Sequence, residues 1–403
     1  MFAIRDGEPI ELTVDSLLAS ATKQSGLSDF GDMSFVVGLE KLIESLKTEG
    51  WHLLKDEMKR DIGPSLVDLL VNRLQVLDDR KKYPEIAEVK IEKPIFFIGM
   101  ARSGSTLIQT LFAQDPANIA PEFWEVMKPS PPPRFGIGAD RQARVAQMMD
   151  WHMNATPGFT TRHPYFIEEG YRALAECGSI GQMSFAGIQF FAFLPVPSYQ
   201  DWFVNADNRH AVEFHRYFLQ HLQWGREGRA WVSKSVEHGA YLEGLLEQYP
   251  DATFIWTHRD LYDQLSSITS TVAVMRQLSS RVDDMPALGM QRINAVRDIF
   301  DRTMKVRSQG NEDKFIDVFY EDMLHNPIGT IRGIYEKIGR PLNADAELNM
   351  QRWLANNNQT KHGKHEYKAD EYGIDRALIE SKFPDYLARF GSELKASAER
   401  YKG

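Results

Sequence analysis

The chain has 403 residues, of which 47 are basic and 56 are acidic, so its formal charge at neutral pH is −9. This balance argues against a protein that coats nucleic acid, because that function needs an extended basic surface. Cys177 is the single cysteine in the sequence, which excludes an intramolecular disulfide and is typical of a reducing compartment.

The first part of the sequence is predicted to be helical. Met1 to Glu8 lack the apolar stretch of a secretory signal. From residue 11 to 80, leucines and other apolar residues recur at spacings of three and four. We expect a helical N-terminal arm over 1–90 and a single larger domain over 91–403. Together with the single cysteine, the missing signal predicts a cytoplasmic protein.

A loop with the spacing of a phosphate-binding loop follows the first apolar strand. Gly99, four residues, Gly104 and Ser105-Thr106 fit the pattern G-x-x-x-x-G-K-[ST], but Ser105 stands in place of the lysine. Arg102 supplies a cation instead, and the helix after the loop offers its N-terminal amides to the same anion. The loop is therefore predicted to bind a phosphate-like group. A kinase would need the missing lysine and a Mg²⁺ site, whereas a sulfuryl group carries less charge.

Short β-like runs alternate with helical stretches after residue 91. Strands are predicted at Ile95–Ile98, Ala230–Val232, Ala252–Trp256 and Phe315–Tyr320, and helices at 239–248, 260–278 and 327–339. Residues from about 135 to 228 separate the first two strands and are predicted to form a mostly helical insertion. The alternation predicts an α/β fold with a parallel sheet flanked by helices, in which ligands bind beyond the carboxyl ends of the strands.

A second anion-binding motif follows the strand predicted at Ala252–Trp256. Arg259 comes just after this strand, and Ser267 lies eight residues later, two turns into the next helix. An arginine offers a planar fork of donors to a phosphate, and a serine hydroxyl adds another donor. Both anion-binding motifs are therefore expected at carboxyl ends of strands.

The two motifs resemble those of the PAPS-dependent sulfotransferases, which transfer a sulfuryl group from 3′-phosphoadenosine 5′-phosphosulfate (PAPS). In that family a [KR]-S-G-[ST]-T loop holds the 5′-phosphosulfate, and residues Arg102-Ser103-Gly104-Ser105-Thr106 have this form. The family holds the 3′-phosphate with an arginine and a serine spaced like Arg259 and Ser267. The resemblance covers about residues 93 to 375. It implies a P-loop-like sulfotransferase fold, PAPS as cofactor, PAP as product and no metal.

The resemblance also implies which residues carry the chemistry. Lys234 and His238 look like the family's lysine and histidine beside the acceptor, although four residues separate them here instead of two. Lys234 and Arg102 would stabilise charge on the transferring group, and His238 would remove the acceptor proton. Glu122 is a second candidate base, because carbohydrate sulfotransferases place a glutamate in a similar Glu-x-aromatic context. A backbone-bonded histidine and a solvated glutamate are the structural alternatives.

Three further features concern the nucleotide part of the cofactor. Tyr320 matches the position at which the family recognises adenine. Lys361, Gly363 and Lys364 resemble the basic loop that covers the 3′-phosphate. Leu107 occupies the position of the tryptophan that stacks on adenine in cytosolic members, so the purine is expected to lie differently.

The insertion is expected to cover the acceptor site. It contains a set of apolar and aromatic residues: Phe185, Phe190, Phe191, Phe193, Leu194 and Trp202. A pocket lined by such side chains favours a small, largely apolar alcohol or phenol as acceptor of the sulfuryl group. Core packing is the alternative reading of the same residues. The longest apolar region, Met183 to Pro197, is too short to span a bilayer, so no stable membrane insertion is expected.

The favoured function is thus a sulfotransferase that acts on an acceptor hydroxyl or amine of a small molecule. The sequence leaves two other functions open. One is a degenerate P-loop nucleotide kinase or NTPase, and the other is a protein that binds PAPS or PAP without turnover.

Overall fold

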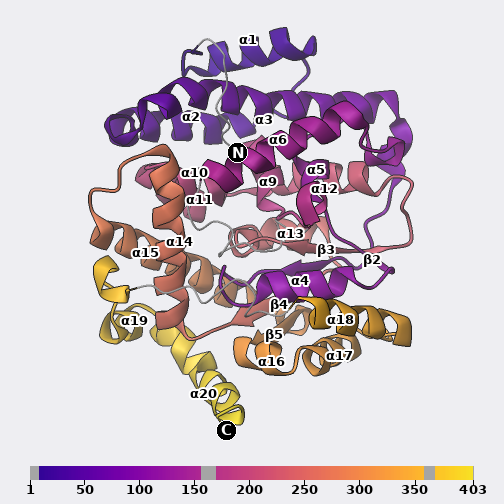
Figure 1. Ribbon diagram of the computed structural model, residues 1–403, viewed down its shortest axis with the longest axis vertical. Helices are drawn as coiled ribbons and strands as arrows, with labels where there is room; N and C mark the ends of the chain where they lie inside the picture. Colours follow the sequence, from indigo (N-terminus) through magenta and orange to yellow (C-terminus); the bar gives the residue numbers. More distant parts are fainter. Residues whose placement is uncertain (1–8, 156–168, 358–367, 403) are drawn as a thin grey trace. The chain divides into compact units, whose positions relative to one another are not determined.

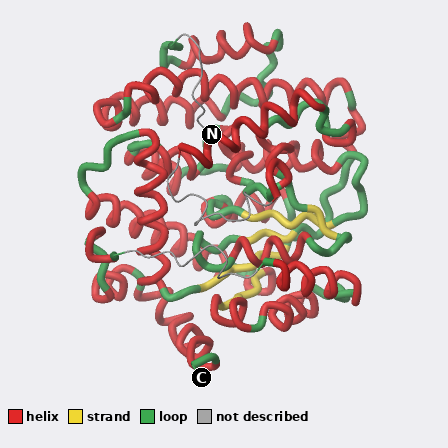
Figure 2. The backbone as a smooth tube through the Cα atoms, in the orientation of Figure 1, coloured by secondary structure: helices red, strands yellow, loops and turns green. Residues whose placement is uncertain are grey.

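The computed structural model describes residues 9–155, 169–357 and 368–402. The chain divides into two compact units. Unit 1 consists of Met1–Lys90, Pro121–Glu227 and Val272–Asp283, and unit 2 of Ile91–Ala120, Gly228–Thr271 and Asp284–Gly403. Helices make up most of the described chain, and its named strands belong to unit 2 (Figure 2).

Unit 2 is built on a parallel sheet. Its strands are β1 (Ile95–Phe97), β2 (Asn118–Ile119), β3 (Ala230–Lys234), β4 (Thr253–His258) and β5 (Phe315–Phe319). The order across the sheet is β2-β3-β1-β4-β5, and every pairing is parallel. The strands that follow β1 lie on both sides of it, and such a reversal marks the ligand-binding edge of open α/β sheets. The predicted α/β fold is confirmed, and the two-residue β2 is the strand that hydrophobic periodicity did not reveal.

Helices flank the sheet of unit 2 (Figure 1). They are α4 (Ser105–Ala113), α13 (Leu242–Gln248), the start of α14 (Leu261–Ser279), α15 (Met285–Ser308), α16 (Tyr320–His325), α17 (Pro327–Lys337), α18 (Ala344–Asn356), α19 (Arg376–Lys382) and α20 (Pro384–Arg400). Short 3₁₀ turns lie at His238–Ala240, Glu312–Lys314 and Ala369–Tyr372. The helices expected at 239–248, 260–278 and 327–339 are all present.

The alternation of β1 side chains places apolar groups on both faces of the sheet. Ile95 and Phe97 pack into a buried cluster with residues of α4, α16, α17 and α18. Phe96 points to the opposite face, where its ring centroid lies 5.8 Å from that of Phe254 and 5.1 Å from that of Tyr249. A strand that is apolar at every position is typical of a sheet covered on both faces. This packing fixes the position of β1 and therefore of the start of the loop that follows it.

Unit 1 is helical. Its helices are α1 (Val14–Ser25), α2 (Phe35–Ser45), α3 (Asp56–Lys82), α5 (Phe123–Met127), α6 (Ala139–Ala155), α9 (Gly178–Gly181), α10 (Ile188–Phe193), α11 (Pro197–Asn205), α12 (Arg209–Gln223) and the end of α14. A π-helical turn at Leu46–Gly50 and 3₁₀ turns at Trp51–Leu53, Pro84–Glu88, Pro133–Phe135, Gly170–Arg172 and Gln182–Ser184 join them. The N-terminal arm and the insertion are thus helical, as predicted.

The aromatic residues of the insertion form part of the core of unit 1. Phe185, Phe190 and Phe191 are buried, and the rings of Phe185 and Phe190 stack at 5.9 Å. Phe185 also stacks at 5.9 Å on Phe35 of α2. Core packing therefore accounts for these side chains, and their expected role as the lining of an acceptor pocket loses its main support. Phe193 and Trp202 are half-buried.

Two buried side chains stabilise the C-terminal end of α10. Arg276 donates from Nη2 to the Phe191 carbonyl oxygen at 2.7 Å, and the Ser279 hydroxyl donates to the Phe193 carbonyl oxygen. Carbonyls in the last turn of a helix lack intrahelical donors, so these bonds satisfy them. Burial lowers the pKa of Arg276 to about 10, which leaves the guanidinium charged at neutral pH.

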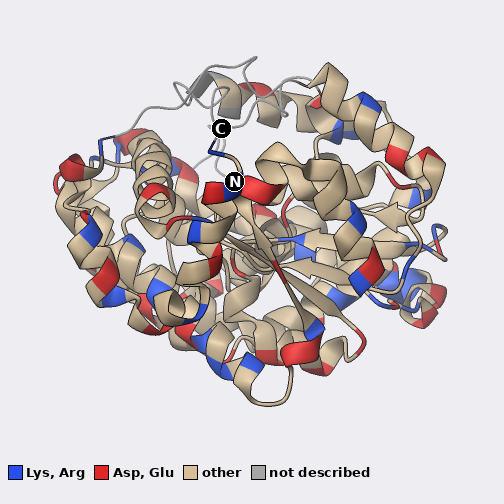
Figure 3. Cartoon of the chain, turned by 90° about the horizontal axis from the view of Figure 1, so that it is seen from below, with Lys and Arg blue, Asp and Glu red and all other residues tan. Residues whose placement is uncertain are grey.

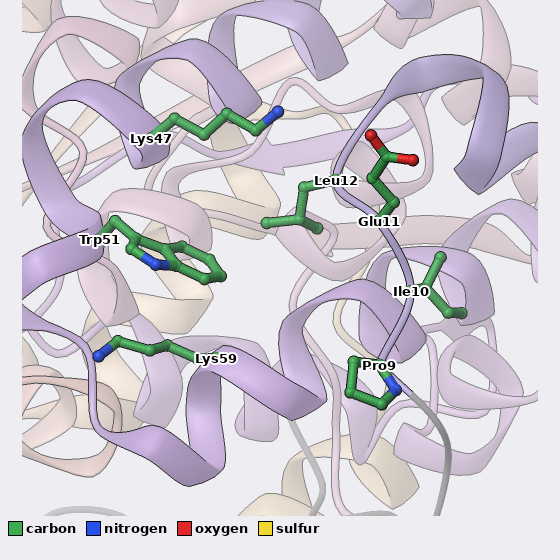
Figure 4. A pocket seen from close by; sticks show the side chains of 7 residues that line it. All are labelled: Pro9, Ile10, Glu11, Leu12, Lys47, Trp51 and Lys59. Carbon is green, nitrogen blue, oxygen red and sulfur yellow. The ribbon is translucent and has the colours of Figure 1, made fainter.

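A surface pocket of about 420 Å³ belongs to unit 1 (Figure 4). Lys47 and Trp51 come from the π-helical and 3₁₀ turns, Lys59 from α3, and Leu12 from the segment before α1. The predicted site residues do not line it. We therefore describe the candidate active site from the geometry of the loop and the strand ends.

The described helices include none that is long and apolar enough to cross a membrane. Acidic and basic residues are interspersed over the helices in the view of Figure 3, in keeping with the modest net charge of −9.

Candidate active site

Two residues of the loop between β1 and α4 have a backbone conformation with positive φ. Gly104 is the N-cap of α4 and adopts the left-handed conformation at φ 81°, which glycine reaches without strain. Arg102 also has a positive φ, of 67°, although it carries a side chain. A non-glycine residue in this region is uncommon and indicates a local constraint of the kind found at functional sites.

The start of α4 offers unpaired backbone donors to an anion. The first N–H groups of a helix have no intrahelical acceptor, and Gly104 has no side chain that could cap them. The amides of Ser105 and Thr106 therefore open the helix with the positive end of its dipole. Ser105 is buried whereas Thr106 is exposed. These groups fit the phosphosulfate that the sequence predicts for this loop.

The Ser103 hydroxyl stabilises the loop and is satisfied by protein groups. It donates to the Met100 carbonyl oxygen at 2.6 Å and lies 2.6 Å from the Thr257 hydroxyl. Because its single proton is used on Met100, Thr257 must donate to Ser103. Ser103 is buried. A contact of Ser103 with cofactor is therefore expected from its backbone amide.

The two predicted phosphate motifs lie together in unit 2. Arg102 donates from Nε to the Ser267 hydroxyl at 3.0 Å. Arg259 donates from Nη1 to the Arg102 carbonyl oxygen at 2.7 Å. Residues that are more than 150 positions apart thus form one polar cluster at the carboxyl ends of β1 and β4. The direct contact of Arg102 with Ser267 is a feature that the spacing of the motifs did not predict.

Tyr320 lies against the same cluster. The guanidinium carbon of Arg259 lies 4.4 Å from the centroid of the Tyr320 ring, a distance at which the cation and the ring attract each other. A Cβ atom added to Gly104 would come within 3.3 Å of the same ring. Tyr320 is the first residue of α16, directly after β5. The predicted adenine-recognition residue therefore packs beside the loop.

Lys234 reaches the loop from β3. It is the last residue of this strand and is buried, and its Nζ donates to the Thr106 hydroxyl at 3.3 Å. The predicted catalytic lysine thus contacts the start of α4, while Arg102 lies on the side of Ser267.

His238 is buried beneath the central strand. Its Nδ1 lies 2.9 Å from the Phe97 carbonyl oxygen, and its ring meets the Phe96 ring edge-on at 5.1 Å. Burial lowers the pKa of His238 to about 4, and the nearby charge of Lys234 acts in the same direction. The imidazole is therefore neutral at pH 7. Because a carbonyl only accepts, the proton is on Nδ1 and the lone pair on Nε2.

Glu122 belongs to unit 1, where it caps α5. Its side chain accepts a bond from the first turn of α5, its backbone N–H donates to Glu125 Oε2 at 2.9 Å, and Trp124 Nε1 donates to its Oε2 at 2.6 Å. Burial raises the pKa of the neighbouring Glu125 although Arg226 lies 2.8 Å away. Glu122 has a structural role, and its function as a base stays a prediction.

Two other predictions concern the cofactor. Lys361, Gly363 and Lys364 lie outside the described residues. Leu107 is buried in the core cluster between α4 and the sheet, so its side chain is not placed to stack on a ligand.

Gln264 and Thr257 support the loop and were not identified from the sequence. Gln264 donates from Nε2 to the Ala101 carbonyl oxygen at 3.0 Å, while Thr257 donates to Ser103. Gly99 packs so tightly on β4 that an added Cβ would lie 1.8 Å from Thr257 Oγ1. Gln264 stands three residues before Ser267, on the same side of α14, and this spacing was the available signal.

Comparisons with known proteins identify the family of this chain. A model of the sulfotransferase family matches residues 94–344, which is more than half of the chain. The omega-hydroxy-beta-dihydromenaquinone-9 sulfotransferase Stf3 of Mycobacterium tuberculosis (strain CDC 1551 / Oshkosh) is 22% identical over 327 residues, which are 76% of this chain and 77% of that protein.

Two solved structures are similar over nearly the whole chain. The sulfotransferase STF9 from Mycobacterium avium has a TM-score of 0.85 and 26% identity, over 96% of this chain and 98% of that one. The sulfotransferase STF1 from Mycobacterium tuberculosis H37Rv has a TM-score of 0.81 and 27% identity, over 94% of this chain and 100% of that one. Since the family model also spans both phosphate motifs, the chain belongs to the sulfotransferase family.

Proposed function

We propose that the protein transfers a sulfuryl group from PAPS to the hydroxyl of a small, largely apolar alcohol or phenol. The observation that carries the proposal is the polar cluster of Arg102, Arg259 and Ser267 beside the uncapped start of α4. A cofactor with phosphate groups at both its 3′ and 5′ positions needs two anion sites, and the cations and amides at this edge of the sheet in unit 2 support the proposal that both sites lie there.

Different residues of the chain would bind the 5′-phosphosulfate, the 3′-phosphate and the adenine of the cofactor. The amides of Ser103 to Thr106 and the Lys234 ammonium would hold the 5′-phosphosulfate, since Lys234 already contacts Thr106. Arg259 and Ser267 would hold the 3′-phosphate, with Arg102 next to Ser267. Tyr320 would lie against the adenine. When bound, PAPS supplies the activated sulfuryl group.

Lys234 is the residue best placed to act on the charge that develops during transfer. Its ammonium lies at the end of β3 against the loop, and it is buried, so its charge acts in a poorly screened environment. The predicted catalytic role of Arg102 has less support, because its side chain lies next to Ser267 at the proposed 3′-phosphate site.

Two residues are candidates for the base. His238 is neutral at pH 7 and carries its lone pair on Nε2, which is the protonation state that a base requires. Glu122 is a carboxylate that holds the start of α5. We propose His238 as the base because it lies in unit 2 close to Lys234, whose ammonium reaches the loop.

The proposed class of acceptor is supported by the name of a relative. Stf3 is named for omega-hydroxy-beta-dihydromenaquinone-9, which is an apolar molecule with a hydroxyl group. That name supports an apolar alcohol as the acceptor class for this chain. An amine acceptor is the alternative, and it would use the same loop and the same lysine.

A thermal-shift experiment tests the cofactor. PAP and PAPS should raise the melting temperature without Mg²⁺, because a ligand that binds only the folded state stabilises it. ATP, which lacks the 3′-phosphate, should raise it far less. The variant Arg259→Ala should lose most of the shift with PAP, while Arg297→Ala, which changes a half-buried arginine of α15 that pairs with Asp298, should keep it.

The same experiment separates the rival functions. Equal shifts with ATP and PAP would remove the two-site assignment and favour the nucleotide kinase. A shift with PAP together with no transfer of labelled sulfate to any acceptor would instead identify a binding protein without turnover.

A further inference from the structure

Residues of the C-terminal helices α19 and α20 form hydrogen bonds with both sequence neighbours of Arg259. His258 and Asp260 flank this arginine in the sequence. His258 Nδ1 lies 2.9 Å from the Tyr386 hydroxyl of α20, and Asp260 Oδ2 accepts a bond from Arg376 Nη1 of α19 at 3.2 Å. α19 and α20 follow residue 344, the end of the region that the family model matches.

The contact between Tyr386 and His258 belongs to a buried polar network. His258 Nε2 lies 2.9 Å from Asp317 Oδ1 of β5, so the neutral imidazole donates there and accepts from Tyr386 at Nδ1. Arg307 of α15 donates to both Asp317 oxygens, at 2.6 and 2.9 Å. The network links α15, β5, β4 and α20 within unit 2.

Asp317 and Arg307, the charged groups of this network, are hydrogen-bonded within it, and these bonds fix the positions of the side chains. Burial alone would raise the pKa of Asp317, but the hydrogen bonds from His258 and Arg307 hold it well below its usual range. Burial lowers the pKa of His258, which keeps the imidazole neutral. A buried network of this kind is stable only when each member keeps its partner, so His258 has one defined position at the end of β4.

Aromatic packing fixes α20 over the same strand. Phe390 lies 4.3 Å from the His258 ring and 5.3 Å from the Trp256 ring, centroid to centroid. Tyr386 lies 5.9 Å from Trp256. These contacts bury one face of α20 against the strand that ends at Arg259. The second link, from Arg376 to Asp260, is a surface pair with an additional contact between Arg376 and the Tyr262 ring at 4.7 Å.

We infer that Tyr386 and Arg376 are positioning residues for the 3′-phosphate site, and that docking of the segment from Arg376 to Phe390 is coupled to binding of PAP. The inference rests on the proposed role of Arg259. The segment fixes the backbone on both sides of Arg259, so the guanidinium is held ready for the phosphate. By linkage, a ligand that binds the ordered arginine also stabilises the docked segment.

Conservative variants test the inference. Tyr386→Phe removes the hydroxyl and keeps the ring, and Arg376→Met removes the charge from the surface pair. Each should weaken PAP binding by roughly three- to tenfold in calorimetry well below the melting temperature. The KM for PAPS should rise with little change in kcat. Arg376→Lys keeps the cation and should recover most of the affinity.

Tyr335→Phe is the matched control. Tyr335 is also buried in unit 2, and its hydroxyl donates to Asp115 Oδ2 at 2.7 Å. This variant should lose stability as Tyr386→Phe does but keep the affinity for PAP. In the unmodified protein, PAP should slow amide hydrogen exchange in residues 376–390, and Tyr386→Phe should reduce this protection.

The outcomes distinguish this inference from the proposed function. If Arg259→Ala leaves PAP affinity unchanged, the cofactor site itself is wrong. If Arg259→Ala abolishes binding while Tyr386→Phe and Arg376→Met match Tyr335→Phe, the cofactor site stands and the positioning role is refuted. Should Tyr386→Phe fail to fold, Arg376→Met decides, because it changes a side chain that is 64% exposed.

Discussion

At the scale of single residues, the environment of a side chain decides what it can do. His238 and His258 are both buried histidines at strand ends, and burial lowers the pKa of each. His258 uses both ring nitrogens in a network of protein groups. His238 bonds a backbone carbonyl through Nδ1 and has a lysine as its charged neighbour. The first arrangement fixes the end of a strand, whereas the second belongs to the residue that we propose as the base.

Lys234→Ala should reduce turnover more than cofactor binding. The ammonium lies against the loop, where charge would develop in the transition state, so its loss should lower kcat on the order of 10²–10³-fold. Steady-state kinetics together with calorimetry of PAP binding would measure both effects. The exposed Lys337 supplies the control variant Lys337→Ala, which should change neither. A loss of PAP affinity as large as the loss of kcat would contradict the catalytic role.

His238 should make stability depend on pH. Its pKa is about 4 in the folded protein and near the ordinary value of 6.5 in the unfolded chain. The unfolded chain therefore takes up the proton first as pH falls, so stability present above pH 6.5 is lost towards pH 4. Between pH 7 and 5 the loss is about 2 kcal/mol for one such histidine.

Urea unfolding at pH 7 and pH 5 checks this dependence. His238→Gln should lose less stability between the two pH values than the unmodified protein. His52→Gln, a change at an exposed histidine, should lose as much as the unmodified protein. An unchanged pH dependence in His238→Gln would show that His238 does not titrate in this way.

At the scale of elements, the neighbours of a helical glycine decide whether a larger residue can replace it. Gly289 lies in α15, where an added Cβ would come within 2.1 Å of the Tyr372 carbonyl oxygen. Gly333 lies in α17 with nothing within 4 Å of an added Cβ. The two positions have the same residue and the same secondary structure, and they differ only in their neighbours.

Alanine at these two positions should have opposite effects on stability. Gly289→Ala should cost about 1–3 kcal/mol, because a backbone carbonyl must move to make room. Gly333→Ala should gain about 0.5–1 kcal/mol, because alanine loses less conformational freedom in a helix. Differential scanning calorimetry of both variants measures the difference. A shift of the same sign for both would disprove the packing argument.

At the scale of the whole molecule, the proposed acceptor class is the property to test. The buried aromatic residues of the insertion stabilise unit 1, so they no longer argue for an apolar acceptor. The name of Stf3 is the remaining support. We expect transfer from labelled PAPS to steroid, phenolic or alkyl alcohols and none to long anionic glycans, because the net charge of −9 does not favour polyanions. Transfer to glycans alone would reverse this choice and leave the sulfotransferase assignment intact.

The sequence by itself determined the fold class and revealed the two motifs that we propose bind phosphate. Gly104, Arg259 and Ser267 were readable because they are local: a glycine for a positive φ, a cation at a strand end and a hydroxyl two helical turns later. The four longer strands were readable because each contains a short apolar run, which is typical of strands in a covered parallel sheet. β2 has two residues, and so short a run has no periodicity to detect.

Only the tertiary structure decided which distant residues meet. The contact of Arg102 with Ser267 and the links from Tyr386 and Arg376 to the neighbours of Arg259 join positions more than a hundred residues apart. Nothing in the local pattern of a single sequence marks such pairs, because they form only when the sheet orders its strands. The role of the insertion's aromatics was also undecided, since core packing and a pocket wall use the same side chains. Burial, which depends on the whole fold, favours core packing for Phe185, Phe190 and Phe191.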